Sequence, residues 1–311
     1  MTTAKSTATS FEKWEKLNPE VKMICVKHMN FLERLRFGAS ATDERNMVNA
    51  FKYPVQELAV YDSHDGLILE LNVKKEENYK MKAKDETNQQ EEQFVPLLLQ
   101  VLRNGTIEKF NTQESEDFPE KTLEALRGLG TIKVTGFLFG ELKAQHFWYL
   151  ENCDPGLVKT VRIHGALPSE QVLDMWTLRN VFEWRVGEAP FETTSKMARR
   201  WIDRGFPVGA RLMIQTAKDT KLDSFVEDFE DRIIEREGES VRIETNHPEK
   251  HIFLKNWEKG PDDVEDCEMF LMIIIPAGMR KGTKEFKDLV DRDREYWGDE
   301  EDEEEEEEAD E

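Results

Sequence analysis

The sequence predicts an α/β protein, α+β overall, that begins with three short helices and continues into a larger domain of strands and helices. Three observations support this prediction. Helical patterns with recognisable caps fill residues 11–52, and strand candidates then recur every 23 to 30 residues within residues 53–297. Finally, twelve of the thirteen residues from 299 to 311 are acidic. We therefore expect a disordered N-terminus at residues 1–10, two folded parts, and a disordered acidic tail at residues 298–311.

The negative charge of the chain is concentrated in this tail. The formal net charge is −22, and the twelve acids of residues 299–311 account for more than half of it, leaving about −10 for residues 1–298. Binding to the phosphates of nucleic acid requires a surplus of lysine and arginine, which releases counterions. We therefore expect no nucleic acid partner.

We expect neither membrane insertion nor secretion. The first ten residues lack the apolar core of a signal peptide, and the longest apolar run, Met269–Ile275, ends at Pro276. The cysteines are odd in number and far apart, which argues against a disulfide framework and against a CxxC metal site: Cys25, Cys153 and Cys267. The expected compartment is reducing, cytoplasmic or nuclear, and we expect no metal and no cofactor.

The first helix is expected directly after Leu17. Asn18 is a good N-cap, Pro19 suits the first helical position, and Glu20 complements the helix dipole. Apolar residues recur along one face with the period of a helix: Leu17, Val21, Ile24, Cys25 and Met29. Three short helices cannot bury all of this apolar surface among themselves, so the pattern favours a partner.

Two further helices complete the predicted module. A short second helix is expected around Phe31–Phe37, and the segment Gly38–Ser40 is expected to break it. Ser40 or Thr42 then caps a third helix. Three short helices thus occupy about forty residues.

A strand hairpin is expected next. The runs VQELAVY and LILELNV, residues 55–61 and 67–73, are joined by the polar turn DSHDG. The polar stretch at residues 74–93 is expected to be a mobile loop or linker.

Strand candidates then alternate with helical patterns. They begin near Ile107, Ile132, Val158, Val181, Arg211 and Val241. One strand and one helix per unit is typical of a leucine-rich-repeat-like curved α/β domain, although the LxxLxLxxN signature is absent, and a single curved sheet of irregular units would give the same pattern. Such short units imply parallel strands with helices on at least one face. The residues expected to face the helices are Val161, Ile163, Phe182, Trp184, Leu212, Ile214, Val241 and Ile243.

Arginines occupy the outward positions of successive strands: Arg162, Arg185, Arg211 and Arg242. If the units stack in register, these side chains form a basic stripe that is suited to bidentate binding of carboxylates. The stripe would then bind an acidic partner, or transiently the chain's own tail. The alternative is that the arginines pair with Glu183 and Glu244 on the same face, as arginines on solvated faces usually do.

The sequence motifs do not indicate catalysis. The string HPEKH, from His247 to His251, superficially resembles the zinc-protease helix motif, but Glu249 is misplaced and Pro248 disfavours a helix, so a surface turn is expected. The sequence contains no GxSxG elbow, P-loop or GxGxxG followed by a helix. The aromatic string QHFWYL, residues 145–150, is expected to pack in the core. We therefore expect a protein that is not an enzyme and has no catalytic residues.

The segment LNPEVKMICVKHM resembles the opening of an F-box, a three-helix module that packs on the Skp-type adaptor of a cullin ubiquitin ligase. The matching positions are Leu17, Glu20, Val21, Cys25, Val26 and Met29. Asn18 replaces the usual proline, with Pro19 shifted by one, and Met29 replaces the usual leucine. The next segment, NFLERLRFGASATDERNMV, resembles nematode-type F-box proteins, and VFEWRV and WIDRGFPVGARLMIQT are similar to their F-box-associated C-terminal region. The resemblance covers most of residues 11–260.

This resemblance implies a substrate-recognition subunit of a Skp-cullin-F-box ubiquitin ligase. The helical module would dock on the Skp-type adaptor and so join the cullin scaffold, while the C-terminal domain binds an unknown protein substrate. The expected adaptor-binding residues are Leu17, Pro19, Val21, Ile24, Cys25, Met29 and Leu35. The alternative is a protein-interaction module unrelated to ubiquitin, whose acidic tail binds basic proteins.

Overall fold

The computed structural model describes residues 14, 16–40, 42–63, 66–73, 79–82, 91–112, 120–167, 171–217, 220–257 and 267–290. The expected disordered N-terminus, residues 1–10, and the expected acidic tail, residues 298–311, lie outside the described residues.

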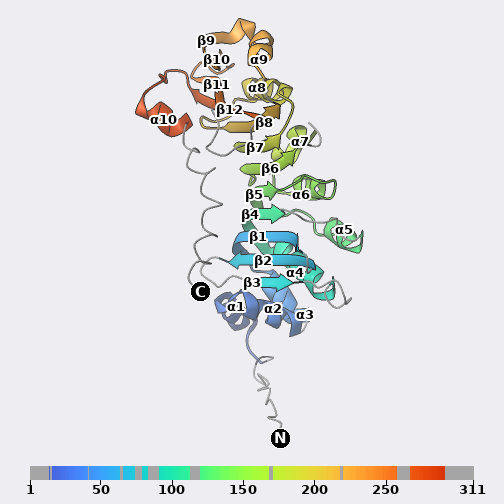
Figure 1. The fold of residues 1–311 in the computed structure, drawn as a ribbon. Coiled ribbons are helices and arrows are strands. Elements are labelled where there is room, and N and C mark those ends of the chain that lie inside the picture. Colours follow the sequence, from blue (N-terminus) through green and yellow to red (C-terminus); the bar gives the residue numbers. More distant parts are fainter. Residues whose placement is uncertain are drawn as a thin grey trace, which may run out of the picture.

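The described residues form a mixed α/β structure built on one twelve-stranded sheet (Figure 1). The strand order is β3-β2-β1-β4-β5-β6-β7-β8-β12-β11-β10-β9. The strands are β1 Tyr53–Ser63, β2 Gly66–Val73, β3 Tyr79–Lys82, β4 Gly105–Thr112, β5 Val134–Phe139, β6 Thr160–Ala166, β7 Glu183–Glu188, β8 Arg211–Ala217, β9 Ile233–Glu237, β10 Ser240–Glu244, β11 Lys250–Trp257 and β12 Cys267–Pro276. The helices are α1 Pro19–His28, α2 Phe31–Ser40, α3 Thr42–Asn49, α4 Glu91–Asn104, α5 Glu120–Arg127, α6 His146–Asn152, α7 Gln171–Asp174, α8 Glu192–Arg204, α9 Asp223–Asp228 and α10 Lys284–Val290, with 3-10 helices η1 Trp176–Leu178 and η2 Glu230–Arg232. The predicted mixture of helices and strands is confirmed.

The middle of the sheet is parallel. Strands β1, β4, β5, β6, β7 and β8 are neighbours in that order, and each pairs in parallel with the next. A parallel connection must cross over the sheet, and here a helix lies in each connection from β4 to β8. Strands β4 to β8 begin within two residues of the predicted starts, from Ile107 to Arg211.

The helices of these connections cover one face of the sheet. Figure 1 shows α5, α6, α7 and α8 on the same side, and α10 on the opposite side. Strand β12 lies between the two layers. Its side chains alternate between the main core, which contains Phe270, Met272 and Ile274, and a second cluster that includes Leu271 and Ile273 and is closed by α10.

Each parallel strand buries apolar residues with a common spacing. In β5, Val134, Phe137 and Phe139 are buried. Phe137 follows Val134 by three residues, and Phe139 follows Phe137 by two. The same spacing recurs in the other units: Val55, Leu58 and Val60; Val158, Val161 and Ile163; Val181, Trp184 and Val186. The strands align these residues in register, so that one row across the sheet is Leu58, Phe110, Phe137, Val161, Trp184 and Leu212.

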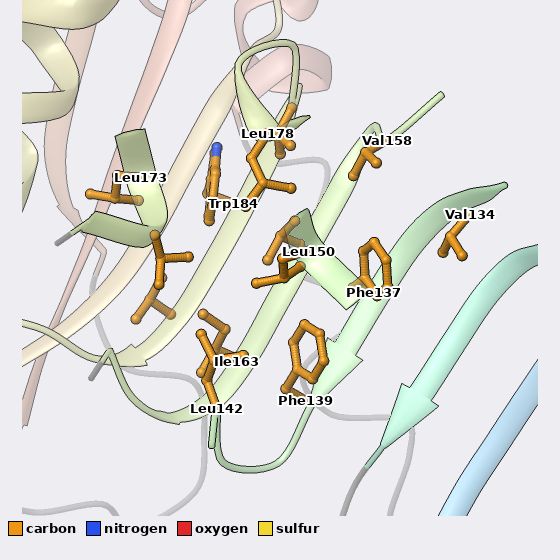
Figure 2. Packing of buried hydrophobic residues seen from close by; sticks show 14 of the residues in the cluster. Val134, Phe137, Phe139, Leu142, Leu150, Val158, Ile163, Leu173, Leu178 and Trp184 are labelled. Atoms are coloured by element: carbon orange, nitrogen blue, oxygen red, sulfur yellow. The ribbon is translucent and has the colours of Figure 1, made fainter. Parts of the chain in front are cut away.

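These rows form the main core with side chains from the helices. Figure 2 shows Phe137, Ile163 and Trp184 projecting from three adjacent strands toward the side where Leu150 and Leu178 pack. Leu150 belongs to α6, in which His146 and Tyr149 are also buried, so the expected packing of the QHFWYL string in the core is confirmed.

Antiparallel strands flank the parallel part on both sides. Strands β1 and β2 form the predicted hairpin, and β3 extends it. At the other side β12 pairs with β8, and β11, β10 and β9 follow. The strand predicted near Val241 is therefore present as β10, but it belongs to an antiparallel meander and not to a further parallel unit. No helix separates β10 from β11, because the turn between them is only five residues long, and this length permits only antiparallel pairing.

The helical module packs against the β3 side of the sheet. Phe31 of α2 is buried, and its ring meets Tyr53 of β1 and Tyr79 of β3 edge-on, with centroids 5.1 and 6.4 Å away. Asn104 at the end of α4 donates a hydrogen bond to Asn49 Oδ1 at the end of α3, with the atoms 2.8 Å apart. The module and the sheet therefore share packing contacts and a hydrogen bond.

Three local expectations were wrong. Helix α2 continues through Gly38 to Ser40, because Gly38 faces Val48 of α3 and its lack of a side chain lets the two helices approach closely. Within the expected loop 74–93, residues 79–82 form β3, since the free edge of β2 pairs with them, and α4 begins at Glu91. Phe182 is only half-buried, because the spacing of the unit places Val181 inward in its stead.

The spacing of the buried rows predicts that two tryptophans contribute very differently to the free energy of unfolding. Trp184 is buried in the central row, whereas Trp176 is 63% exposed. Trp184→Ala should lower the free energy of unfolding by about 3–5 kcal/mol, because it leaves a cavity in the packed row. The matched substitution Trp176→Ala should change it by about 0.5 kcal/mol or less. Urea-induced unfolding followed by circular dichroism measures both, and equal losses in the two variants would contradict the proposed core.

The packing also predicts an unreactive thiol. Cys153 is buried, its Sγ donates a hydrogen bond to the carbonyl oxygen of Leu150 at 3.1 Å, and burial raises the pKa of its thiol to about 11. Since the thiolate is the reactive form, Cys153 should resist iodoacetamide at pH 7.5 in the folded chain and react after unfolding in urea. Mass spectrometry of tryptic peptides measures this, and equal labelling in both conditions contradicts it.

Candidate functional site

Helix α1 exposes an apolar face. Ile24 is 57% exposed and Val21 is 43% exposed, and both stand among the most exposed large apolar residues of the described chain. Val26, by contrast, is fully buried. At 100° per residue, Val26 lies about 160° from Ile24 and about 140° from Val21 around the helix, so α1 packs on the module with one side and presents Val21 and Ile24 on the other.

The other expected adaptor-binding residues fall into three groups. Cys25 is half-buried and lies beside Val21 around the helix, and Leu17 is half-buried just before the N-cap. Pro19 is exposed, but it lies about 160° from Val21 around the helix, and Met29 is the half-buried C-cap residue. Leu35 belongs to α2, and its side chain lies outside the described part of the structure. The structure thus gathers Val21, Ile24 and Cys25 on one face, with Leu17 next to it.

Local hydrogen bonds determine where α1 begins and how it meets α2. Asn18 Oδ1 accepts a hydrogen bond from the Glu20 amide at 2.9 Å, which confirms the expected N-cap. Asn30 and Glu33 form a reciprocal capping box at the start of α2, with distances of 2.8 and 2.9 Å. Arg34 of α2 donates to the carbonyl oxygens of Met29 and Lys27, which neutralises the carbonyl end of α1.

Trp14 joins the later two helices of the module. Its ring meets Phe37 of α2 edge-on at 4.9 Å, and its Nε1 donates to Glu44 Oε1 of α3 at 2.9 Å. Lys22 of α1 lies over the same ring, 5.5 Å from its centroid. These contacts tie the chain just before α1 to α2 and α3.

Two arginines of the predicted stripe lie side by side on neighbouring strands. Arg162 of β6 and Arg185 of β7 are direct neighbours across the strands, and both donate to Oε1 of Glu183, at 3.1 and 2.8 Å. This is the pairing with Glu183 that was the alternative to a free basic stripe.

Arg211 and Arg242 bind the C-terminal part of the described chain. Arg211 donates through Nη2 to the carbonyl oxygen of Leu289 in α10 at 3.0 Å. Arg242 is 7% exposed and donates to the carbonyl oxygens of Met279, Pro276 and Ala277, and through Nε to His251 Nδ1 at 2.8 Å. Arg242 therefore holds the chain that links β12 to α10, and Arg211 holds the C-terminal end of α10. The expected pairing with Glu244 is replaced by hydrogen bonds to carbonyls and to His251.

The histidines of the HPEKH string lie at a chain reversal. His247, Pro248 and Glu249 form the turn between β10 and β11, which agrees with the expected surface turn, and His251 belongs to β11. Among the described residues, no group of three or more histidine, cysteine, aspartate or glutamate residues could hold a metal ion. Within the same residues, every helix is too short or too polar to cross a membrane.

A cavity of about 690 Å³ lies where the connections enter the parallel strands. Its lining includes Lys159, Arg179 and Arg204, the acid Asp174, and the exposed ring of Trp176. Sequence reasoning missed this site. The signal for it is positional. Lys159 directly precedes β6, Arg179 lies four residues before β7, and Arg204 ends α8 seven residues before β8. The amino ends of parallel strands meet at one edge of a sheet, so these residues come together there.

The hydrogen bond between Arg242 and His251 predicts a dependence of stability on pH. Burial and then the charge of Arg242 lower the pKa of His251 below its ordinary value of about 6.5, with Glu244 opposing this. Because the unfolded chain binds the proton more readily, the free energy of unfolding should fall as the pH drops below about 6.5. Urea unfolding between pH 7.5 and 5 measures this fall. His251→Asn, which keeps an acceptor for Arg242 but cannot titrate, should reduce it, and an unchanged fall would contradict the role of His251.

Comparisons of the chain with protein-family models, with curated proteins and with solved structures each found no match. That α1, α2 and α3 form an F-box is therefore a proposal, and it is supported by the residues and the geometry of α1.

Proposed function

We propose that the chain is a substrate-recognition subunit of a Skp-cullin-F-box ubiquitin ligase. In this proposal α1, α2 and α3 form the F-box and dock on the Skp-type adaptor. The sheet domain is leucine-rich-repeat-like and binds a protein target in the cytoplasm or the nucleus. The chain itself carries no catalytic group in this scheme, since ubiquitin transfer is performed by the partners.

The observation that carries the proposal is the exposed pair Val21 and Ile24 on α1. Large apolar side chains of a helix are usually buried, and this helix already buries Val26 on its other side. Burying a valine or isoleucine side chain in an interface contributes about 1.5–3 kcal/mol each. A groove on an adaptor that accepts this face therefore supplies the burial that the chain itself does not, in the manner of helix-in-groove recognition.

The sheet domain supports the second half of the proposal. Its units bury apolar residues at positions one, four and six, which is the spacing of the LxxLxL part of a leucine-rich repeat with other apolar residues in place of leucine. On the face away from α5 to α8, the parallel part carries the polar cluster of Arg162, Glu183 and Arg185. Extended sheets of this kind offer a broad surface for a protein partner.

The adaptor proposal is tested with single substitutions in the full-length chain. Val21→Asp or Ile24→Asp places a charge on the docking face, and each should weaken binding of a purified Skp-type adaptor at least tenfold, which corresponds to about 1.4 kcal/mol or more. Because both side chains are exposed, neither change should alter the thermal midpoint by more than a few degrees. Biolayer interferometry with immobilised adaptor measures the affinity.

Ile234→Asp is the matched control. Ile234 lies on β9 at the opposite end of the sheet and is 43% exposed, the same fraction as Val21. The control variant should bind the adaptor like the parent chain. If the parent chain does not bind the adaptor at all, the proposal is overturned, and the interaction module with an acidic tail becomes the better interpretation.

A further inference from the structure

The cavity at the amino edge of the parallel strands is basic in a chain that is otherwise acidic. Lys159, Arg179 and Arg204 contribute three positive charges to its lining, and Asp174 contributes one negative charge. The local balance of about +2 contrasts with the formal net charge of −22 for the whole chain. At physiological ionic strength charges more than about 8 Å away are largely screened, so the lining decides what binds there.

Arg200 adds a guanidinium whose donors are not satisfied. It lies one turn before Arg204 on α8, and its side chain is only 9% exposed. Its Nε and Nη2 have no hydrogen-bond partner among the described residues, and its ion pair with Asp174 is long, at 3.7 Å, because that carboxylate is 84% exposed. Burial and the neighbouring charge of Arg204 lower the pKa of Arg200. Arg200 is not part of the cavity's lining and these two nitrogens are covered by protein, so it adds positive charge behind the site without contacting a ligand there.

A second arginine at the cavity is held by an aromatic ring. The guanidinium of Arg179 stacks on Trp176, with Cζ 3.1 Å from the ring centroid, and its Nε is also buried without a hydrogen-bond partner in the described chain. Stacking fixes the plane of a guanidinium while leaving its edge free to donate to a carboxylate. Since Trp176 is 63% exposed, its outer surface is available to the stem of a bound side chain.

Further basic residues continue from the cavity along the same edge. Lys52 precedes β1, Arg103 precedes β4 and Lys133 precedes β5, and all three are exposed. The three charges are close enough that Lys133 and Arg103 contribute to lowering the pKa of Lys52, after burial. An extended ligand with several negative charges fits this edge better than a small anion does.

We propose that this cavity binds a carboxylate-rich peptide segment, and that residues 299–308 of the chain itself occupy it in the free protein. All ten residues of this segment are acidic. The proposal does not depend on adaptor docking, which involves α1 at the other end of the module.

The end of α10 places this segment within reach. The carbonyl oxygen of Leu289 accepts from Arg211, the Arg211 amide donates to the Phe182 carbonyl oxygen at 2.9 Å, and the Phe182 amide donates to the Lys159 carbonyl oxygen at 2.7 Å. The described chain therefore ends near the edge that carries the cavity. Eight residues lie between Val290 and Asp299, an extended reach of about 30 Å. Such a tether gives a local concentration in the millimolar range, so a site of modest affinity is occupied.

The test uses two full-length chains and a labelled peptide. The first chain is unchanged, and in the second the six glutamates at positions 303–308 are replaced by glutamine. The probe is a fluorescein-labelled peptide with the sequence of residues 299–311, and its binding is followed by fluorescence anisotropy in 50 mM salt. The glutamine chain should bind the probe at least tenfold more tightly than the unchanged chain, because its own segment has lost six of its ten acids and competes more weakly.

Substitutions in the glutamine chain then locate the site. Arg204→Gln should weaken probe binding at least tenfold, and Trp176→Ala should weaken it by a smaller factor; both side chains are exposed, so the circular dichroism spectrum should not change. Arg36→Gln is the matched control, since Arg36 is an exposed arginine on α2. Equal binding by the Arg204 and Arg36 variants overturns the site. Equal binding by the unchanged and glutamine chains overturns occupancy by the chain's own segment and indicates an acidic segment of a partner.

Discussion

The structure depends on the register between neighbouring parallel strands. Each unit of one strand and one helix buries only the apolar residues that the adjacent unit covers, so no unit is stable alone. Register aligns Phe110, Phe137, Val161 and Trp184 in one row, and a slip of one residue would turn a whole strand's apolar side chains toward the polar face. The helices, the loops and the polar edge are all positioned by this row.

A stack of this kind needs its two ends covered, and the protein uses different means at each end. On one side the hairpin β1–β2 and strand β3 continue the sheet, and α2 packs Phe31 against it. On the other side β12 is inserted beside β8, and α10 covers its second face. The guanidinium of Arg242 holds the chain between β12 and α10 through its carbonyl groups, and the guanidinium of Arg211 binds a carbonyl in the last turn of α10.

Local features of the structure could be predicted from the sequence, and long-range pairings could not. The caps at Asn18 and the starts of β4 to β8 follow from residue types and from periodicity within a short window. The position of β12 in the sheet does not follow from the sequence. It pairs with β8, about fifty residues away, and an apolar run does not indicate which strand it will pair with. Likewise the alternation in the strands correctly predicted the outward arginines, but only the fold reveals that two of them bind carbonyls.

The same distinction applies to the candidate sites. The period of the apolar residues in α1 predicted an apolar face. It did not show which of these residues are exposed, because the helix also packs against the module. The structure shows that Val21 and Ile24 are exposed and that Val26 is buried. The basic cavity gathers Lys159, Arg179 and Arg204 from three connections that are 20 and 25 residues apart in the sequence. Such a convergence is visible only once the strands are side by side.

The position of β12 also has a consequence for synthesis on the ribosome. From β4 to β8 each strand pairs with the one made just before it, so this part of the sheet can assemble as the chain emerges, N-terminus first. The meander of β9, β10 and β11 reaches the sheet only through β12, the last strand of the described chain. Until residue 276 has been made, β8 has an open edge and the meander has no anchor. The nascent protein is thus most prone to mispairing at this edge in the interval between the synthesis of β8 and that of β12.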